Sequence, residues 1–167
     1  MQPEFRHTFG KNFNFDEKGK FLFEAPTLDT PNRPFGTAFE ETSFAYQYKN
    51  VLFVTVDCWY QKDPSTVISG SDTVVGTVEG QHLQWFEDVL KEARLEKNSW
   101  IIRHIIVQAH LPILGPVRKV LSSGMLMDVD NENNEFWQIM RKFEVDIYFC
   151  GEVHANTVTK GELCLYT

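Results

Sequence analysis

The stretch of sequence that decides the fold lies between residues 43 and 57. It reads Ser43-Phe-Ala-Tyr-Gln-Tyr48, then Lys49-Asn50, then Val51-Leu-Phe-Val-Thr-Val-Asp57. β-Branched and aromatic residues on both sides of a two-residue turn predict a β-hairpin, and Asn50 is the turn residue suited to a positive φ. The second strand is apolar at almost every position, which is typical of a strand in the middle of a sheet with both faces covered.

A helix followed by a strand is predicted twice after the hairpin. The first helix runs from Gln81 to about Lys97, because apolar residues recur there every three or four positions. Its buried face contains Leu83, Phe86, Leu90 and Ala93, with Trp85 and Val89 beside them, whereas Glu87, Lys91, Glu92 and Arg94 face solvent. A buried strand at Trp100–Gln108 follows. The second helix leads into a strand at Val145–Cys150 and carries Phe136, Trp137, Ile139, Met140 and Phe143.

These elements predict one domain over residues 1–167, of the α/β (or α+β) class, in which helices flank a mixed sheet. Residues 1–42 show little periodicity and contain eight phenylalanines. They are interpreted as an irregular, aromatic-rich segment held by aromatic anchors, with a short strand at Phe21–Phe23. Residues 58–79, which contain Gly70, Gly76 and Asp63-Pro64, are predicted to be a loop.

The composition excludes several classes of protein. With 43% apolar and 14% aromatic residues in 167 positions, the chain has the makeup of a globular domain rather than of a disordered or fibrous one. The net charge of −7 offers no general attraction for nucleic acid or for an anionic membrane. It also repels phosphate-bearing substrates, unless a bound metal reverses the local field. Neither a signal peptide nor an apolar run of about 18 residues occurs, so the localisation is not indicated.

Several familiar sites do not fit the sequence. GxGxxG, P-loop and GxSxG motifs do not occur. Asp128-Val-Asp-Asn-Glu132 begins like a calcium loop, but Asn133 stands where the loop needs glycine and Ile139 where it needs glutamate. These carboxylates are expected instead to favour the N-terminus of the helix that follows. An odd number of cysteines without CxxC predicts buried structural thiols beside strands, at Cys58, Cys150 and Cys164.

Two histidines follow the carboxyl ends of predicted strands. His110 comes just after the first of the two later strands and precedes Leu-Pro, and Glu152 and His154 follow the second strand through Gly151. Sites gather at such strand ends in sheets flanked by helices, and imidazole with carboxylate suits Zn²⁺, Mn²⁺ or Fe ions. The remaining histidines are interpreted as structural: His7, His82 and His104.

Three segments carry a family resemblance: Gln81-His-Leu-Gln-Trp-Phe-Glu-Asp-Val-Leu, Ile105-Ile-Val-Gln-Ala-His110-Leu-Pro, and Val145-Asp-Ile-Tyr-Phe-Cys-Gly-Glu-Val-His154. Over roughly residues 40–155 the chain resembles the C-terminal half of a calcineurin-like metallophosphoesterase, on the purple acid phosphatase side. That family has an isolated histidine after a strand, and about forty residues later Gly-His-x-His. Here His154 comes 44 positions after His110. The resemblance implies a four-layer αββα sandwich, of which this chain would form a part.

The resemblance also implies metal-binding roles for three residues. His110 corresponds to the isolated histidine, a ligand of the second metal ion. His154 corresponds to the last histidine of Gly-His-x-His, a ligand of the first ion. Glu152 stands where the family has the first histidine of that motif, which also binds the second ion. The ions implied are Zn, Mn or Fe, the substrate is a phosphate ester, and no other catalytic residue is indicated.

The family's upstream motifs Asp-x-His, Gly-Asp-x-x-Asp and Gly-Asn-His-Asp do not occur in residues 1–50. The carboxylate that bridges the two ions comes from that part, so the dinuclear site is expected to be incomplete. The sequence is therefore interpreted as a metal-dependent phosphoesterase, which hydrolyses phosphate esters with a metal-bound hydroxide, in the form of a truncated chain that is inactive alone. Met1 would then be an internal or misassigned start.

Other interpretations stay open. A non-catalytic binding module would keep the fold and use its strand edges or aromatic surface to bind a partner, and Glu152 in place of histidine agrees with this. A thiol or acid–base hydrolase would use Cys150, His110 and His154. A sheet that lacks strands has open edges, which predicts a homo-oligomer or aggregation.

Overall fold

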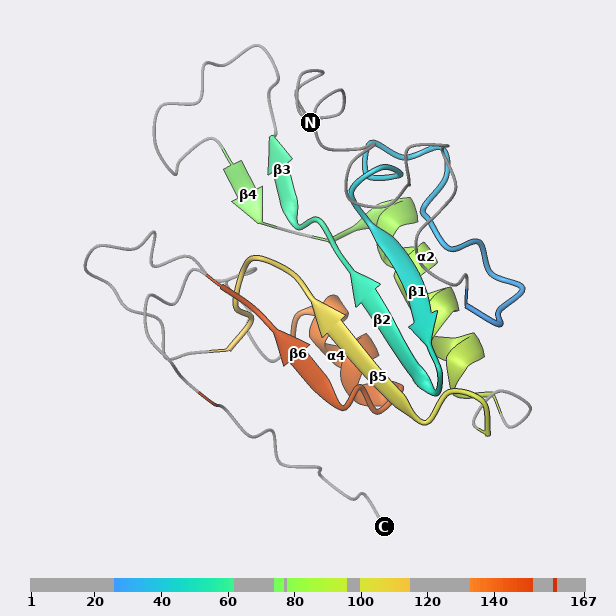
Figure 1. Ribbon diagram of the computed structural model, residues 1–167. Helices are drawn as coiled ribbons and strands as arrows, with labels where there is room; N and C mark the ends of the chain where they lie inside the picture. The colour runs from blue at the N-terminus through green and yellow to red at the C-terminus, as the bar shows by residue number, and fades with distance from the viewer. Residues whose placement is uncertain are drawn as a thin grey trace.

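The computed structural model describes residues 26–61, 74–76, 78–95, 100–114, 133–151 and 158. In this part of the chain, strands β1, β2, β5 and β6 form a four-stranded sheet in that order, and β3 and β4 form a two-stranded sheet. Helices α2 and α4 lie on the same side of the larger sheet (Figure 1). The elements are β1 Phe44–Tyr48, β2 Val51–Thr55, β3 Trp59–Gln61, β4 Val74–Gly76, α2 Gly80–Ala93, β5 His104–Gln108, α4 Glu135–Lys142 and β6 Ile147–Phe149. The predicted α+β class with a mixed sheet is confirmed.

The predicted hairpin consists of β1 and β2, which pair antiparallel through the two-residue turn Lys49–Asn50. The positive φ lies on Lys49, at 53°, so the expectation that Asn50 would adopt it is wrong. The neighbouring strand provides the reason. The Asn50 carbonyl accepts the N–H groups of Arg103 and His104 at 2.9 and 3.1 Å, which ties Asn50 to the start of β5 and leaves the reversal of chain direction to Lys49.

Three of the four strands run parallel. β5 pairs with β2 in a register that places Gln108 opposite Thr55, and β6 pairs with β5 in a register that places Phe149 opposite Gln108. Parallel strands end at the same edge of a sheet, so residues 56–58, 109–111 and 150–151 lie together. We call these residues the carboxyl edge. β2 is an interior strand, as predicted, although only one of its faces is fully buried.

The hydrophobic core lies between the sheet and the two helices. Phe86 of α2 and Phe136 of α4 meet there with ring centroids 4.5 Å apart, and Tyr148 of β6 packs edge-on against Phe136. Four sheet residues that face the helices are fully buried: Leu52, Val54, Ile105 and Val107. The predicted face of the first helix is confirmed at Trp85, Phe86, Val89, Leu90 and Ala93, which are buried, and Leu83 packs against the same core.

Helix α2 also holds the chain that precedes the hairpin. Glu92 was expected to face solvent, which is wrong, because it is buried against residues 29 and 30. Its carboxylate accepts the N–H groups of Asp29 and Thr30 at 2.6 and 2.8 Å and the Thr30 hydroxyl at 2.7 Å. Hydrogen bonds to a charged acceptor offset the cost of removing that carboxylate from water. The Trp85 indole N–H adds a bond of 2.8 Å to the Pro31 carbonyl.

Residues 26–43 form neither helix nor strand, in agreement with the irregular segment predicted for this region. Phe39 is an aromatic anchor, since its ring stacks on His82 with centroids 4.4 Å apart. Phe35 is not an anchor, because 65% of it is exposed. The strand predicted at Phe21–Phe23 lies outside the described residues.

Some predicted boundaries need correction. β5 begins at His104, and the strand predicted from Trp100 is too long; Trp100 itself is 77% exposed. Helix α2 ends at Ala93 rather than near Lys97. β6 spans fewer residues than the predicted Val145–Cys150.

The loop predicted over residues 58–79 contains β3 and β4, which pair antiparallel with Trp59 opposite Gly76. That prediction is wrong for these residues. Three-residue strands are too short to show a recognisable alternation of apolar and polar positions.

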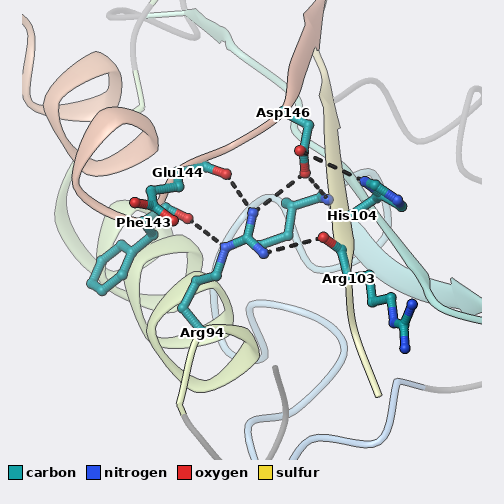
Figure 2. A network of polar contacts seen from close by, with 7 residues as sticks. Arg94, Arg103, His104, Phe143, Glu144 and Asp146 are labelled. Atoms are coloured by element: carbon teal, nitrogen blue, oxygen red, sulfur yellow. Dashed lines mark hydrogen bonds and ion pairs between the residues drawn. The ribbon is translucent and has the colours of Figure 1, made fainter. Parts of the chain in front are cut away.

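Arg94, just after α2, joins this helix to the start of β6. Its guanidinium donates to the carbonyl oxygens of Phe143, at 2.8 Å, and Glu144, and it pairs with the Asp146 carboxylate at 3.3 Å (Figure 2). Asp146 accepts the N–H of Ile105 at 2.8 Å and donates its own N–H to the Ile105 carbonyl at 3.0 Å. This Arg94 network (Arg94, Ile105, Phe143, Glu144, Asp146) sets the register of β6 against β5, and thereby the alignment of the carboxyl edge.

Candidate metal site at the carboxyl edge

His110 lies two residues beyond β5, at the carboxyl edge. Leu111 and Ile113, which follow it, are fully or almost fully buried, and Pro112 between them is buried too. These residues anchor the chain in the core directly after the strand. His110 is exposed, so its imidazole is presented at the surface from a fixed backbone. An exposed imidazole on a rigid support is a suitable nitrogen donor for a metal ion.

The segment after β6 lies directly against His110. The Ala109 N–H donates to the Phe149 carbonyl at 3.0 Å, and the Gly151 N–H donates to the His110 carbonyl at 2.8 Å. A Cβ atom placed on Gly151 would lie 3.3 Å from Nδ1 of His110 and 3.5 Å from its Cε1. Glycine therefore allows the imidazole to approach the backbone that leads into the Gly-Glu-Val-His segment.

Of the three predicted metal ligands, the structure describes His110. Glu152 and His154 lie outside the described residues, and the described chain reaches Gly151 in contact with His110. Within the described residues, no group of three or more His, Cys, Asp or Glu side chains could hold a metal ion. A site that used the predicted ligands Glu152 and His154 would join them to His110 at this edge. The nitrogen donor and the glycine contact fit such a site.

A third strand end reaches the same edge and was missed in the sequence. Asp57 lies two residues beyond β2, and its N–H donates to the buried hydroxyl of Ser43 at 2.9 Å. The Val56 N–H donates to the Gln108 carbonyl at 2.9 Å, which continues the pairing of β2 with β5 beyond the strand. The parallel pairing of two distant strands locates Asp57, and no local motif marks it.

The cysteines at this edge differ in exposure. Cys58 is buried, as predicted, whereas Cys150 is exposed, so the prediction of a buried thiol is wrong there; Cys164 lies outside the described residues. Burial raises the pKa of the Cys58 thiol, although hydrogen bonds from the backbone of Leu111 and His110 oppose this. Partial burial also raises the pKa of Cys150. A nucleophilic cysteine needs a lowered pKa, so these thiols do not favour the thiol-hydrolase interpretation.

His82 and His104 lie away from the carboxyl edge. His82 is buried between aromatic rings of α2 and residues 26–43, which agrees with a structural role. His104 falls in the middle of the predicted Trp100–Gln108 strand, but it is the first residue of β5. It is 58% exposed, with Nδ1 3.7 Å from Oδ1 of Asp146. His7, like the Asp128–Glu132 carboxylates, lies outside the described residues.

Comparison of the chain with family models, with curated proteins and with solved structures gives no match. Among the helices in the described residues, none has the length and apolar character needed to cross a membrane. The functional interpretation therefore depends on the residues of the carboxyl edge.

Proposed function

We propose that the carboxyl edge carries the C-terminal share of a calcineurin-like metallophosphoesterase site, whose reaction is the metal-dependent hydrolysis of phosphate esters. One observation carries this proposal. Gly151 packs against the imidazole of His110, so the two motifs that are far apart in the sequence begin at adjacent points of the sheet. The order of the motifs, their spacing and this contact all agree with one shared metal site.

The face of the four-stranded sheet away from α2 and α4, on which no helix of the described residues packs (Figure 1), supports the proposed four-layer sandwich. On the face away from α2 and α4, one residue from each strand lies in register across the sheet: Tyr46, Phe53, Ile106 and Ile147. Each is half-buried or exposed, none is charged, and the rings of Tyr46 and Phe53 stack with centroids 4.8 Å apart. An apolar sheet face of this kind packs on a second sheet in a sandwich.

The proposed ligands divide between two metal ions. His110 and Glu152 would hold one ion, and His154 would contribute to the other. When bound, such ions act as Lewis acids that neutralise developing charge on the phosphate oxygens. The chain itself has a net charge of −7, which repels a phosphate ester. Divalent ions at this edge would therefore also be needed to bind the substrate.

We propose further that this chain alone does not turn over a phosphate ester. His110, Glu152 and His154 provide three donors, whereas two ions that share a bridging carboxylate need more. The three upstream motifs that carry the other donors in the family do not occur in residues 1–50. Metal binding and catalysis are therefore separable properties of this chain.

The experiment that tests the proposal is a Mn²⁺ titration by calorimetry, combined with a chromogenic phosphate ester assay. The variant is His110→Ala, and the matched control is His104→Ala, which removes an exposed imidazole from the opposite end of the same strand. We expect the unmodified chain to bind Mn²⁺, His110→Ala to weaken binding by at least about tenfold, and His104→Ala to have little effect.

The outcomes separate the competing interpretations. A chain that does not bind Mn²⁺, or a His110→Ala variant that binds like the control, contradicts the metal site and favours the non-catalytic binding module. Turnover of the phosphate ester that depends on both Mn²⁺ and His110 would support the metal site. It would contradict only the proposal that the isolated chain is inactive.

A further inference from the structure

Asp57 and His110 occupy matching positions on neighbouring strands. Thr55 pairs with Gln108 in the parallel register of β2 and β5, and the Gln108 side-chain amide donates to the Thr55 hydroxyl at 2.7 Å. These two side chains therefore lie on the same face of the sheet. Asp57 and His110 are each two residues further along, and side chains alternate between faces with a period of two. They form the next pair on that face.

The residues between and after these positions support the same alternation. Val56 and Cys58, on either side of Asp57, are buried. The Cys58 thiol receives hydrogen bonds from the backbone of Leu111 and His110, so the chain at residue 58 still runs beside the end of β5. Asp57 is only half-buried, which agrees with a side chain on the opposite side from its two neighbours.

The backbone at Asp57 is also held in place. Its N–H donates to Ser43 Oγ, and Ser43 is fully buried. The preceding residue, Val56, donates to the Gln108 carbonyl. A carboxylate on a backbone fixed from both neighbouring strands has the preorganisation that a metal ligand requires. Along the edge, His110 thus has Gly151 on one side and Asp57 on the other.

We propose that Asp57 is an oxygen ligand of the metal ion that His110 binds. This inference rests on the proposed function, and it adds a donor that the sequence motifs do not include. Carboxylate and imidazole on adjacent strands suit Mn²⁺, Zn²⁺ or Fe²⁺. The carboxylate also supplies negative charge at a site that must attract a cation. Within the described residues, the proposed ligand pair then draws on two parallel strand ends, after β2 and β5.

The test compares Mn²⁺ affinity, by calorimetry, in Asp57→Asn and Asp88→Asn. Asp88 lies on α2 and contacts Gln84 of the same helix, so its variant makes the same change of charge without touching the carboxyl edge. We expect Asp57→Asn to weaken Mn²⁺ binding by at least about tenfold and Asp88→Asn to stay within about twofold of the unmodified chain. The visible absorption of bound Co²⁺ should change with Asp57→Asn, because the ligand set changes.

A second measurement needs no variant and keeps the test decisive if Asp57→Asn unfolds. Mn²⁺ bound to the unmodified chain should broaden the carboxyl ¹³C signal of Asp57 at concentrations that leave that of Asp88 sharp. Equal broadening of both signals, or equal affinities of the two variants, would overturn the role of Asp57. If His110→Ala still abolishes binding in that case, the proposed metal site stands. A chain that binds no Mn²⁺ at all overturns both.

Discussion

At the scale of single residues, His82 is the most unusual side chain in the described structure. It is 2% exposed, and neither ring nitrogen has a hydrogen-bond partner among the described residues. Its ring stacks on Phe39 and lies beside Trp85, with centroids 4.4 and 6.0 Å apart. Burial lowers the pKa of His82 to about 4 from its ordinary value of 6.5. The folded protein therefore contains this histidine in its neutral form.

The consequence is a loss of stability in mild acid. Below about pH 6.5 the unfolded chain binds a proton at His82 that the folded chain excludes until about pH 4. The free energy of unfolding therefore falls by about 1.4 kcal/mol per pH unit in this window, about 3 kcal/mol in total. In His82→Phe this contribution disappears. The free energy of unfolding of the variant, measured by urea titration at several pH values, should therefore fall less steeply as the pH is lowered. If the free energy of unfolding depended on pH in the same way in both proteins, the neutral, buried state of His82 would be contradicted.

Gly151 allows a second prediction at this scale. In Gly151→Ala the new methyl group would lie 3.3 Å from Nδ1 of His110, so the imidazole must move by a few tenths of an ångström. Because His110 is exposed, it can move at little cost, and we expect the free energy of unfolding to change by less than about 1 kcal/mol. Mn²⁺ affinity should fall several-fold, because the donor is displaced. Unchanged affinity in calorimetry would show that the close contact has no role in metal binding.

At the scale of elements, the Arg94 network links a helix to the register of two strands. Replacing Arg94 with methionine leaves the carbonyl groups of Phe143 and Glu144 and the carboxylate of Asp146 without their shared donor. Hydrogen bonds to charged groups contribute about 1.5–3 kcal/mol, and the partial exposure of these groups reduces that value. We expect Arg94→Met to lower the free energy of unfolding by about 2 kcal/mol in urea titrations.

The matched control is Lys142→Met on α4. Lys142 pairs with Glu87 at 2.8 Å, but its side chain is largely exposed. Exposed ion pairs contribute little, so a change below about 0.5 kcal/mol is expected. Equal effects of the two variants would mean that the Arg94 network does not hold β6 in register.

Local sequence patterns predicted the elements but not their distant partners. The hairpin and both helices could be located because apolar spacing and turn residues report local structure. Glu92 was misplaced because its partners, Asp29 and Thr30, lie about sixty residues earlier and leave no mark on the helical pattern. Asn50 was misassigned for the same reason, since its carbonyl bonds to the chain before β5.

The candidate site shows the same division. The position of His110 just beyond a strand could be predicted, because an apolar run comes directly before it in the sequence. Its neighbour across the sheet, Asp57, could not, because only the parallel register of β2 and β5 brings the two strand ends together. Glu152 and His154 remain predictions, since both lie outside the described residues.

At the scale of the whole molecule, the four-stranded sheet has an apolar face, and within the described residues β6 is an edge strand. On that strand Ile147 and Phe149 are 44% and 57% exposed. Exposed strands of this kind favour association of chains. We expect concentration-dependent self-association in light scattering, and a lower apparent mass for Phe149→Lys.

Leu95→Lys, at an exposed apolar residue just after α2, is the control for this prediction and should not change the apparent mass. A monomer at all concentrations, in the unmodified chain and in both variants, would show that the apolar face does not drive association.

The central claim, that the carboxyl edge binds a metal ion, is tested most directly by two-dimensional NMR of the unmodified chain during a Mn²⁺ titration. The backbone amide signals of His110, Leu111 and Gly151 should broaden first, at low Mn²⁺. Those of Arg103, His104 and Ile105, at the opposite end of the same strand, should stay sharp. Broadening that begins at the opposite end, or that affects both ends equally, would contradict the claim.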